Sequence, residues 1–418
     1  MCSLGQELQR RGHQVSLFGI PEIQAKIDKA NLHFFEIGSE AYPYDGRNSV
    51  YSPLGKLSGI AGLKFAVETS EQMTKILFRE APNAIKRAGI DLLLVDQLTA
   101  AGGTIANYLN IPFITICNTL TLHQEASIPP SVTDWSTNDL WCAKLRNQLA
   151  YQFLNHLTRT VWQMICQQRH AWRLWPYRHR EDAYSQLAQI CQIPKALDFP
   201  YSQLPPWFHY VGPLNTAVST EDIEAFPFGK LSRKPLIYAN LGTLQNRNKD
   251  IFQHIADACL EIDAQLVISM GNPKADLSTM HFSGTPMVFA FPPHRELISR
   301  SHLVITHAGS TAVTCLSAGV PMVAIPISMD QPGMAARLAR AGAAEIIPLA
   351  KLDIPYLRRA IQTVLDQDTY RHNAIRLSND IKASGGVCLA ADIVEQVAAN
   401  NAPALNELNG KNQDLKKF

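Results

Sequence analysis

The sequence lacks any apolar run of the roughly 18 residues that a membrane-spanning helix needs, so we predict no segment that crosses a bilayer. It also lacks any cysteine pattern, because its eight cysteines are scattered, with no C-x-x-C pair and no spacing typical of metal ligands. We therefore predict reduced thiols, a cytoplasmic location and no metal site.

A large net charge is missing as well. The 418 residues include 38 Lys and Arg and 36 Asp and Glu, a formal net charge of +2. Attraction to nucleic acid requires a concentrated basic surface, so we predict no nucleic-acid partner. With 46% hydrophobic and 18% charged residues the chain is globular, and it is too long for one compact core. Its length favours two domains.

Short apolar runs rich in β-formers alternate with helical patterns along most of the chain. In the first half such runs lie at 15–18, 92–95 and 113–116, with helical patterns at 65–87 and 100–109 between them. This alternation predicts a parallel sheet wrapped by helices, and a second alternation follows. We predict an α/β fold of two facing Rossmann-like domains, residues 1–211 and 235–400, with a linker at 212–234 and a polar tail at 401–418.

A helical pattern at about 139–185 interrupts the first alternation. Between residues 141 and 180 it contains four tryptophans and several basic residues, but no Asp or Glu. One interpretation is an insertion whose aromatic side chains pack on the first domain while its basic ends stay solvated. The other is a surface that rests on anionic lipid or guides an apolar acceptor, which would make this a peripheral membrane protein.

The densest functional signal lies at 303–331, where an apolar strand leads into His307, Gly309, Ser310 and Thr311 and a helix begins. A helix start offers unpaired backbone N–H groups and a partial positive charge, which suit a diphosphate. The histidine and the two hydroxyls add donors, and Gly309 allows close backbone approach. The alternative is an ordinary turn whose hydroxyls cap the helix.

Neighbouring residues favour ligand binding over capping. The next strand ends at Asp330 and Gln331, a carboxylate and an amide that can hold sugar hydroxyls. The turn N-L-G-T, with Gly242 and Thr243, ends the first strand of the same domain and directs its N–H groups toward the same cleft.

Two further positions belong to this predicted cleft. The segment F-P-P-H, with Pro293 and His294, provides a rigid edge on which a nucleobase can stack. Asp96 ends the apolar run that starts at Asp91, and open α/β sheets bind ligands at the carboxyl ends of their strands.

These motifs, in this order, resemble the nucleoside-diphosphate-sugar-dependent glycosyltransferases of the two-domain GT-B fold, and among them the bacterial zeaxanthin glucosyltransferase type. The resemblance covers nearly the whole chain, through L-G-Q-E-L-Q-R-R-G-H-Q-V, L-L-V-D-Q, F-H-Y-V-G-P, Y-A-N-L-G-T-L-Q-N, T-H-A-G, G-V-P-M-V-A-I-P and D-Q-P-G. It implies inverting transfer of a hexose, by family default from UDP-glucose, to a hydroxyl of a lipophilic acceptor such as a carotenoid. It implies no metal and no cofactor besides the UDP-sugar co-substrate.

The resemblance also assigns roles to residues. His307, Gly309, Ser310, Thr311 and Thr243 would hold the diphosphate, Asp330 and Gln331 the sugar, and Pro293 and His294 the base. Helix and histidine donors would neutralise the departing diphosphate. Asp96 matches the aspartate that orients a histidine base, which deprotonates the acceptor.

The sequence departs from the family pattern at two places. The first strand and the loop that carries the base histidine have no counterpart, which leaves an open slot in the first sheet. After His307 the sequence has T-C-L at 314–316, where relatives carry an acidic residue that binds ribose. Two alternatives therefore stay open: a catalytically impaired remnant that binds nucleotide sugars, and a nucleotide-sugar epimerase, for which Asp330 is the one clear acid or base.

Overall fold

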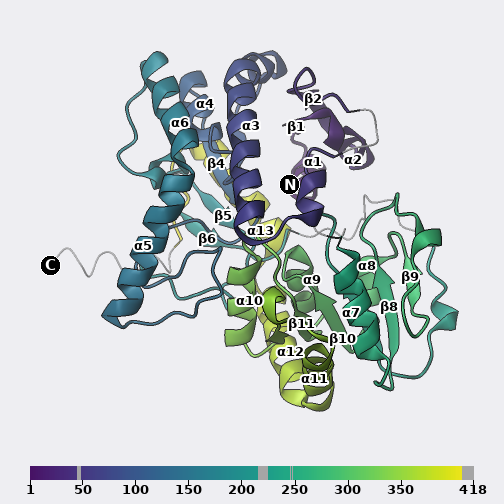
Figure 1. The fold of residues 1–418 in the computed structure, drawn as a ribbon. Coiled ribbons are helices and arrows are strands. Elements are labelled where there is room, and N and C mark those ends of the chain that lie inside the picture. Colours follow the sequence, from purple (N-terminus) through teal and green to yellow (C-terminus); the bar gives the residue numbers. More distant parts are fainter. Residues whose placement is uncertain (45–48, 215–224, 245, 247, 407–418) are drawn as a thin grey trace.

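The structure is a computed structural model that describes residues 1–44, 49–214, 225–244, 246 and 248–406. Parallel strands and their covering helices form two halves that face each other across a cavity (Figure 1). The fold is therefore α/β with two Rossmann-like halves, as the alternation of strands and helices predicts.

The first half contains helices on both sides of short strands. Its elements are α1 (Cys2–Arg10), β1 (Ser16–Gly19), η1 (Pro21–Ile23), α2 (Gln24–Lys29), β2 (His33–Glu36), η2 (Ser52–Lys56), α3 (Gly59–Ala88), β3 (Leu93–Asp96), α4 (Gly102–Leu109), β4 (Phe113–Cys117), α5 (Trp141–Leu157), α6 (Arg159–Ala171), η3 (Arg180–Ala183), β5 (Gln189–Cys191) and β6 (Phe208–Tyr210).

Two parallel sheets make up this half. One has the order β1-β2 and the other the order β3-β4-β5-β6, so β1 and β3 are edge strands of separate sheets. Residues of both edge strands line the same cavity. An opening that forms part of this cavity therefore separates the two sheets.

The second half has one larger sheet. Its elements are η4 (Phe228–Lys230), β7 (Leu236–Asn240), α7 (Lys249–Cys259), β8 (Gln265–Ser269), η5 (Leu277–Thr279), β9 (Met287–Phe289), α8 (His294–Arg300), β10 (Leu303–Thr306), α9 (Ser310–Ser317), β11 (Met322–Ala324), α10 (Gln331–Arg340), β12 (Ala344–Ile346), η6 (Leu349–Lys351), α11 (Ile354–Asp366), α12 (Asp368–Lys382) and α13 (Gly386–Asn400).

The order of these strands sets the position of the site. The sheet runs β12-β11-β10-β7-β8-β9, so the chain proceeds from β7 to one side, returns to β10 and then proceeds to the other side. All residues of β7 and β10 are buried, because separate apolar clusters cover the two faces of the sheet. The order reverses between β7 and β10, and ligands of such folds bind at the carboxyl ends of strands at that point.

The last helix differs from the predicted domain limits. Helix α13 falls within the range 235–400, yet it packs against α1 of the first half, where Leu4 and Leu8 share a core with Ile393. The guanidinium of Arg11 reinforces this contact, since it lies 2.6 Å from a carboxylate oxygen of Asp392. The amphipathic pattern marks which face of α13 is buried, but it does not show which half receives that face.

The helical insertion contains tryptophans that pack on the first half and tryptophans that are exposed to solvent. Trp172 stacks on Tyr108 at 4.1 Å between ring centroids and meets Phe78 edge-on at 5.5 Å, so it anchors α6 to α3 and α4. Trp141 and Trp175, by contrast, are 76% and 88% exposed. Within the described residues no helix has the length and apolar character needed to span a bilayer.

Candidate active site

A cavity of about 1860 Å³ runs from the slot between β1 and β3 in the first half to the space between the two halves, at the carboxyl ends of β3, β7 and β10. Nearly all the residues predicted for the site line it: Asp96, Gly242, Thr243, His294, His307, Gly309, Ser310, Thr311, Asp330 and Gln331. The exception is Pro293, which is buried at the start of α8, while its neighbour Pro292 lines the cavity. The fold thus gathers segments that are more than 200 residues apart in the sequence.

His307 follows β10, and two glycines hold its ring. A Cβ atom on Gly242 would lie 2.6 Å from Cε1 of His307, and one on Gly309 would lie 2.5 Å from Nε2. The φ angle of Gly242 is +73°, a left-handed conformation that other residues rarely adopt. Any larger residue at either position would collide with the imidazole ring, so both positions require glycine for the ring to lie where it does.

The ring of His307 is neutral and has an unpaired nitrogen. The residue is 9% exposed, and burial lowers its pKa from 6.5 to about 4. Its Nδ1 atom is buried and has no hydrogen-bond partner in the part of the chain that the structure describes. Native proteins rarely leave buried polar groups unpaired. One nitrogen of this cavity-lining imidazole is therefore left without a partner among the described residues.

Helix α9 begins directly after this histidine. Gly309 is its N-cap, no side chain caps it, and Ser310 and Thr311 form its first turn. Ala308 has a φ angle of +61°, a strained conformation for a residue with a side chain. The strained turn directs the start of α9 toward the cavity, where the N–H groups of the first turn favour an anion.

Asp330 and Gln331 differ in their surroundings. The Oε1 atom of Gln331 accepts N–H groups from Ile327 at 2.8 Å and Ser328 at 3.1 Å, so this amide closes the loop after β11. Burial raises the pKa of Asp330, and a backbone hydrogen bond from Leu120 opposes that rise. Since Leu120 belongs to the first half, the carboxyl group of Asp330 faces that half across the cavity.

Polar side chains of β7 contact the residues predicted to bind the nucleobase and the diphosphate. The hydroxyl of Tyr238 lies 3.1 Å from Nδ1 of His294, and burial lowers the pKa of His294 to about 4. The Oδ1 atom of Asn240 accepts the N–H of Gly242 at 2.8 Å and so fixes the glycine turn. We did not predict a role for Asn240, although its place at the end of β7 was a usable signal.

Three neighbouring strands of the first half end in polar residues that meet at the cavity. The carboxylate of Asp96, the last residue of β3, accepts hydrogen bonds from the N–H of Leu98 at 2.8 Å and from the amide of Asn118, after β4. Gln192, after β5, donates to the carbonyl of Asn118. Sequence reasoning identified Asp96 and missed the other two, which the same rule of polar residues after buried strands could have found.

The T-C-L segment lacks the acidic residue expected to bind ribose, but the cavity contains a carboxylate elsewhere. Thr314, in the T-C-L segment, lines the cavity, and so does Glu296 of α8. A carboxylate is therefore present in the cavity although the loop after His307 lacks one.

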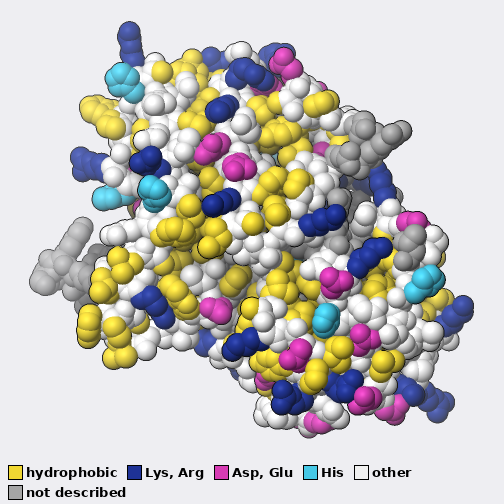
Figure 2. All heavy atoms as spheres, viewed as in Figure 1, with side chains coloured by type: hydrophobic (Ala, Val, Ile, Leu, Met, Phe, Trp, Pro, Cys, Tyr) yellow, Lys and Arg dark blue, Asp and Glu magenta, His cyan; other side chains and the backbone are white. Residues whose placement is uncertain are grey.

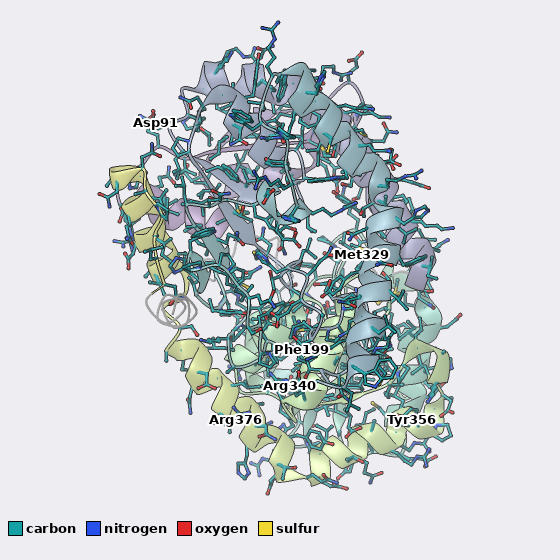
Figure 3. All side chains as sticks on the ribbon, turned by 90° about the vertical axis from the view of Figure 1, so that its left-hand side faces the viewer. Asp91, Phe199, Met329, Arg340, Tyr356 and Arg376 are labelled. Atoms are coloured by element: carbon teal, nitrogen blue, oxygen red, sulfur yellow. The ribbon has the colours of Figure 1, made fainter. Side chains whose placement is uncertain are left out.

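A buried ion pair fixes α10, which carries Asp330 and Gln331 at its start, to the first half. The Nε atom of Arg337 lies 2.6 Å from Oδ1 of Asp198, and both side chains are 1% exposed. The guanidinium also lies 4.1 Å from the ring centroid of Phe199. Figure 3 shows Phe199 next to Arg340, which donates to the carbonyl of Asp198 at 2.6 Å. No sequence signal could have paired Arg337 with a residue 139 positions away.

The strand order reverses between β7 and β10, and a helix starts there next to a buried, neutral histidine. The other half of the molecule faces this place across the cavity. Together these features define an enzyme cleft for a nucleotide-linked substrate. Similarity to known proteins specifies the class. The chain belongs to the family described as UDP-glucoronosyl and UDP-glucosyl transferase, whose sequence profile matches residues 6–383. The protein is therefore a glycosyltransferase, and the predicted family is confirmed.

Individual relatives agree with this assignment. The chain is 30% identical to zeaxanthin glucosyltransferase of Pantoea ananas over 410 residues, which cover 97% of this chain and 94% of that protein. It is also 30% identical to the zeaxanthin glucosyltransferase of Pseudescherichia vulneris over 406 residues, 96% of this chain and 94% of that one.

Solved structures share the fold at lower identity. The calicheamicin glycosyltransferase matches with a TM-score of 0.71 and 18% identity, over 96% of this chain and 95% of that one. The spinosyn rhamnosyltransferase in complex with thymidine diphosphate matches with a TM-score of 0.68 and 18% identity, over 94% and 95% of the two chains. The GT-B architecture predicted from the sequence is thus confirmed.

Proposed function

We propose that this glycosyltransferase moves glucose from UDP-glucose, with inversion, to a hydroxyl of a lipophilic acceptor such as a carotenoid. The observation that carries the proposal is the neutral His307, held between Gly242 and Gly309 beside the start of α9. The names of the two zeaxanthin glucosyltransferases support the choice of sugar and acceptor.

We assign the proton of His307 to Nε2 and leave Nδ1 unprotonated, because an unpaired buried donor is rarer than an unpaired buried acceptor and Nδ1 has no partner among the described residues. Nε2 then donates to a diphosphate oxygen, together with the N–H groups of the first turn of α9. As charge develops on the departing UDP, these fixed donors stabilise it without a metal ion or any further cofactor.

The remaining predicted residues would surround the sugar and the base. We assign Asp330 to the sugar hydroxyls, Gln331 to the loop that positions Asp330, and His294 with Pro292 to the base. Ser310, Thr311 and Thr243 would add donors to the diphosphate, while Pro293 acts through the start of α8. In this proposal residues 235–382 form the donor-binding part and the first half binds the acceptor.

The acceptor side allows a second candidate function. Asp96 is assigned to orient a base, yet among the residues that the structure describes its carboxylate accepts hydrogen bonds from Asn118 and Leu98 and none from a histidine. This favours, as the second candidate, a protein that binds the nucleotide sugar and transfers it poorly. Family membership gives no support to the epimerase alternative.

Calorimetric titration with UDP-glucose tests the donor site, with His307→Ala as the variant and the exposed His372→Ala as the matched control. We expect binding by the parent and by the control, and at least about tenfold weaker binding by His307→Ala, because a charge-assisted hydrogen bond contributes roughly 1.5–3 kcal/mol. Equal binding by all three would refute the assigned role of His307. Release of UDP with a hydroxylated carotenoid then separates transfer from binding alone.

A cytoplasmic location, which the free thiols of all eight cysteines favour, belongs to the same proposal.

A further inference from the structure

The outer face of α5 carries a stripe of exposed apolar side chains. Trp141, Leu145, Leu149 and Phe153 are 76%, 47%, 56% and 51% exposed, and Leu140, just before the helix, is 59% exposed. A spacing of four residues places these side chains along one side of the helix. They extend over about 18 Å, at a rise of 1.5 Å per residue. An apolar surface of this length on a soluble fold marks an interaction site.

The helical segment that carries the stripe is basic. The segment 141–180 contains seven Lys and Arg and no Asp or Glu. Arg159, Arg173 and Arg178 are exposed, whereas Arg169 is buried and Arg146 lies over the ring of Trp135. The exposed carboxylate of Asp139, just before α5, lies 3.5 Å from the ammonium of Lys144. Figure 2 shows apolar side chains gathered over the lower end of α5 as placed in Figure 1, with a basic side chain beside them.

This charge distribution decides between two occupants. A second copy of the chain would bring two basic segments together, which costs free energy through repulsion of like charges. An anionic bilayer supplies both an apolar layer for the stripe and negative headgroups for the arginines. Trp175, at 88% exposure, lies in the same basic segment, and tryptophan favours the boundary between headgroups and acyl chains.

The inner face of α5 connects this surface to the cavity. The side-chain amide of the fully buried Asn147 donates to the carbonyl of Ala126 at 2.9 Å, and the hydroxyl of Tyr151 donates to the carbonyl of Ile128 at 3.0 Å. Both carbonyls belong to the loop after β4, which begins at the cavity-lining Asn118. One side of the helix thus holds the loop that leads to the active site, and the other side is free to meet lipid.

We propose that the outer face of α5 docks on an anionic lipid bilayer and brings the loop after β4 to the membrane surface, where a lipophilic acceptor enters the cavity. Entry of the acceptor rests on the proposed function, whereas docking rests on the exposed face alone.

Sedimentation with vesicles tests the docking. The probes are vesicles of phosphatidylcholine with and without phosphatidylglycerol. The test variant is Leu145→Glu with Leu149→Glu, and the matched control is Leu260→Glu with Ile375→Glu, two exposed apolar residues of the second half. We expect the parent and the control to bind the anionic vesicles about tenfold better than the neutral ones, and the test variant to lose about tenfold.

Several outcomes would overturn the proposal. The first is that the parent does not bind anionic vesicles, and the second is that the parent and the test variant bind them equally. The third is that light scattering shows a dimer of the parent, which the test variant abolishes, while no vesicle binding is seen. Calorimetry with UDP-glucose on the same proteins keeps the two proposals apart. Vesicle binding without donor binding supports docking and refutes the donor assignment, and the reverse result refutes docking alone.

Discussion

The buried pair of Arg337 and Asp198 allows a quantitative prediction about how the two halves are held together. In Arg337→Met, the carboxylate of Asp198 would keep the hydroxyl of Tyr210 at 2.9 Å and the N–H of Phe199 at 2.8 Å, but it would lose its cation. Breaking one side of a buried pair costs roughly 3–5 kcal/mol. Both side chains are 1% exposed, so water does not screen this loss.

Urea unfolding followed by tryptophan fluorescence measures the change. We expect the Arg337→Met variant to be less stable by about 3–5 kcal/mol, and Arg337→Met with Asp198→Asn to recover most of that loss, because the second change removes the unpaired charge. The same single variant should bind UDP-glucose more weakly, since Arg337 holds the helix that begins next to Asp330.

Two results would refute this reasoning. One is a loss of less than about 1 kcal/mol in Arg337→Met, the range of an exposed ion pair. The other is a double variant no more stable than the single one, which would mean that the unpaired carboxylate is not the source of the cost.

Three further predictions concern the site. Burial holds the pKa of His307 at about 4, below its ordinary 6.5, so the unfolded chain takes up the proton first as the pH falls. The free energy of unfolding should therefore decrease from about pH 6.5 to pH 4, by up to about 3 kcal/mol. The urea midpoints at pH 7 and pH 5 should differ less in His307→Asn than in the parent, and an equal difference would contradict the burial argument. Gly242→Ala should weaken UDP-glucose binding at least about tenfold in calorimetry, because its Cβ would displace the imidazole ring of His307 and its φ angle costs about 1 kcal/mol. Gly229→Ala, where a Cβ meets nothing within 4 Å, is the control. Equal effects of the two changes would refute the role of Gly242 in positioning His307. Asn118→Ala should lower the rate of UDP release with acceptor while donor affinity stays unchanged, because the amide of Asn118 donates to Asp96, which we assign to the acceptor side. A change in donor affinity alone would contradict this assignment.

Local sequence determined where the site residues lie along the chain. Apolar runs with β-forming residues predicted parallel strands, and that pattern alone placed Asp96, at the end of β3, and His307, just after β10, at the carboxyl edges of the sheets. The glycines at 242 and 309 were also visible in the sequence, because a turn that approaches a ligand closely needs them.

Tertiary structure decided which surfaces meet. Periodicity shows that α13 buries one face, but only the topology places that face on α1 of the first half. The pairing of Arg337 with Asp198, and the position of the His307 ring between Gly242 and Gly309, join residues that no local pattern relates. Such contacts depend on strand order and on helix packing across the whole chain, whereas sequence periods report only which side of an element avoids water.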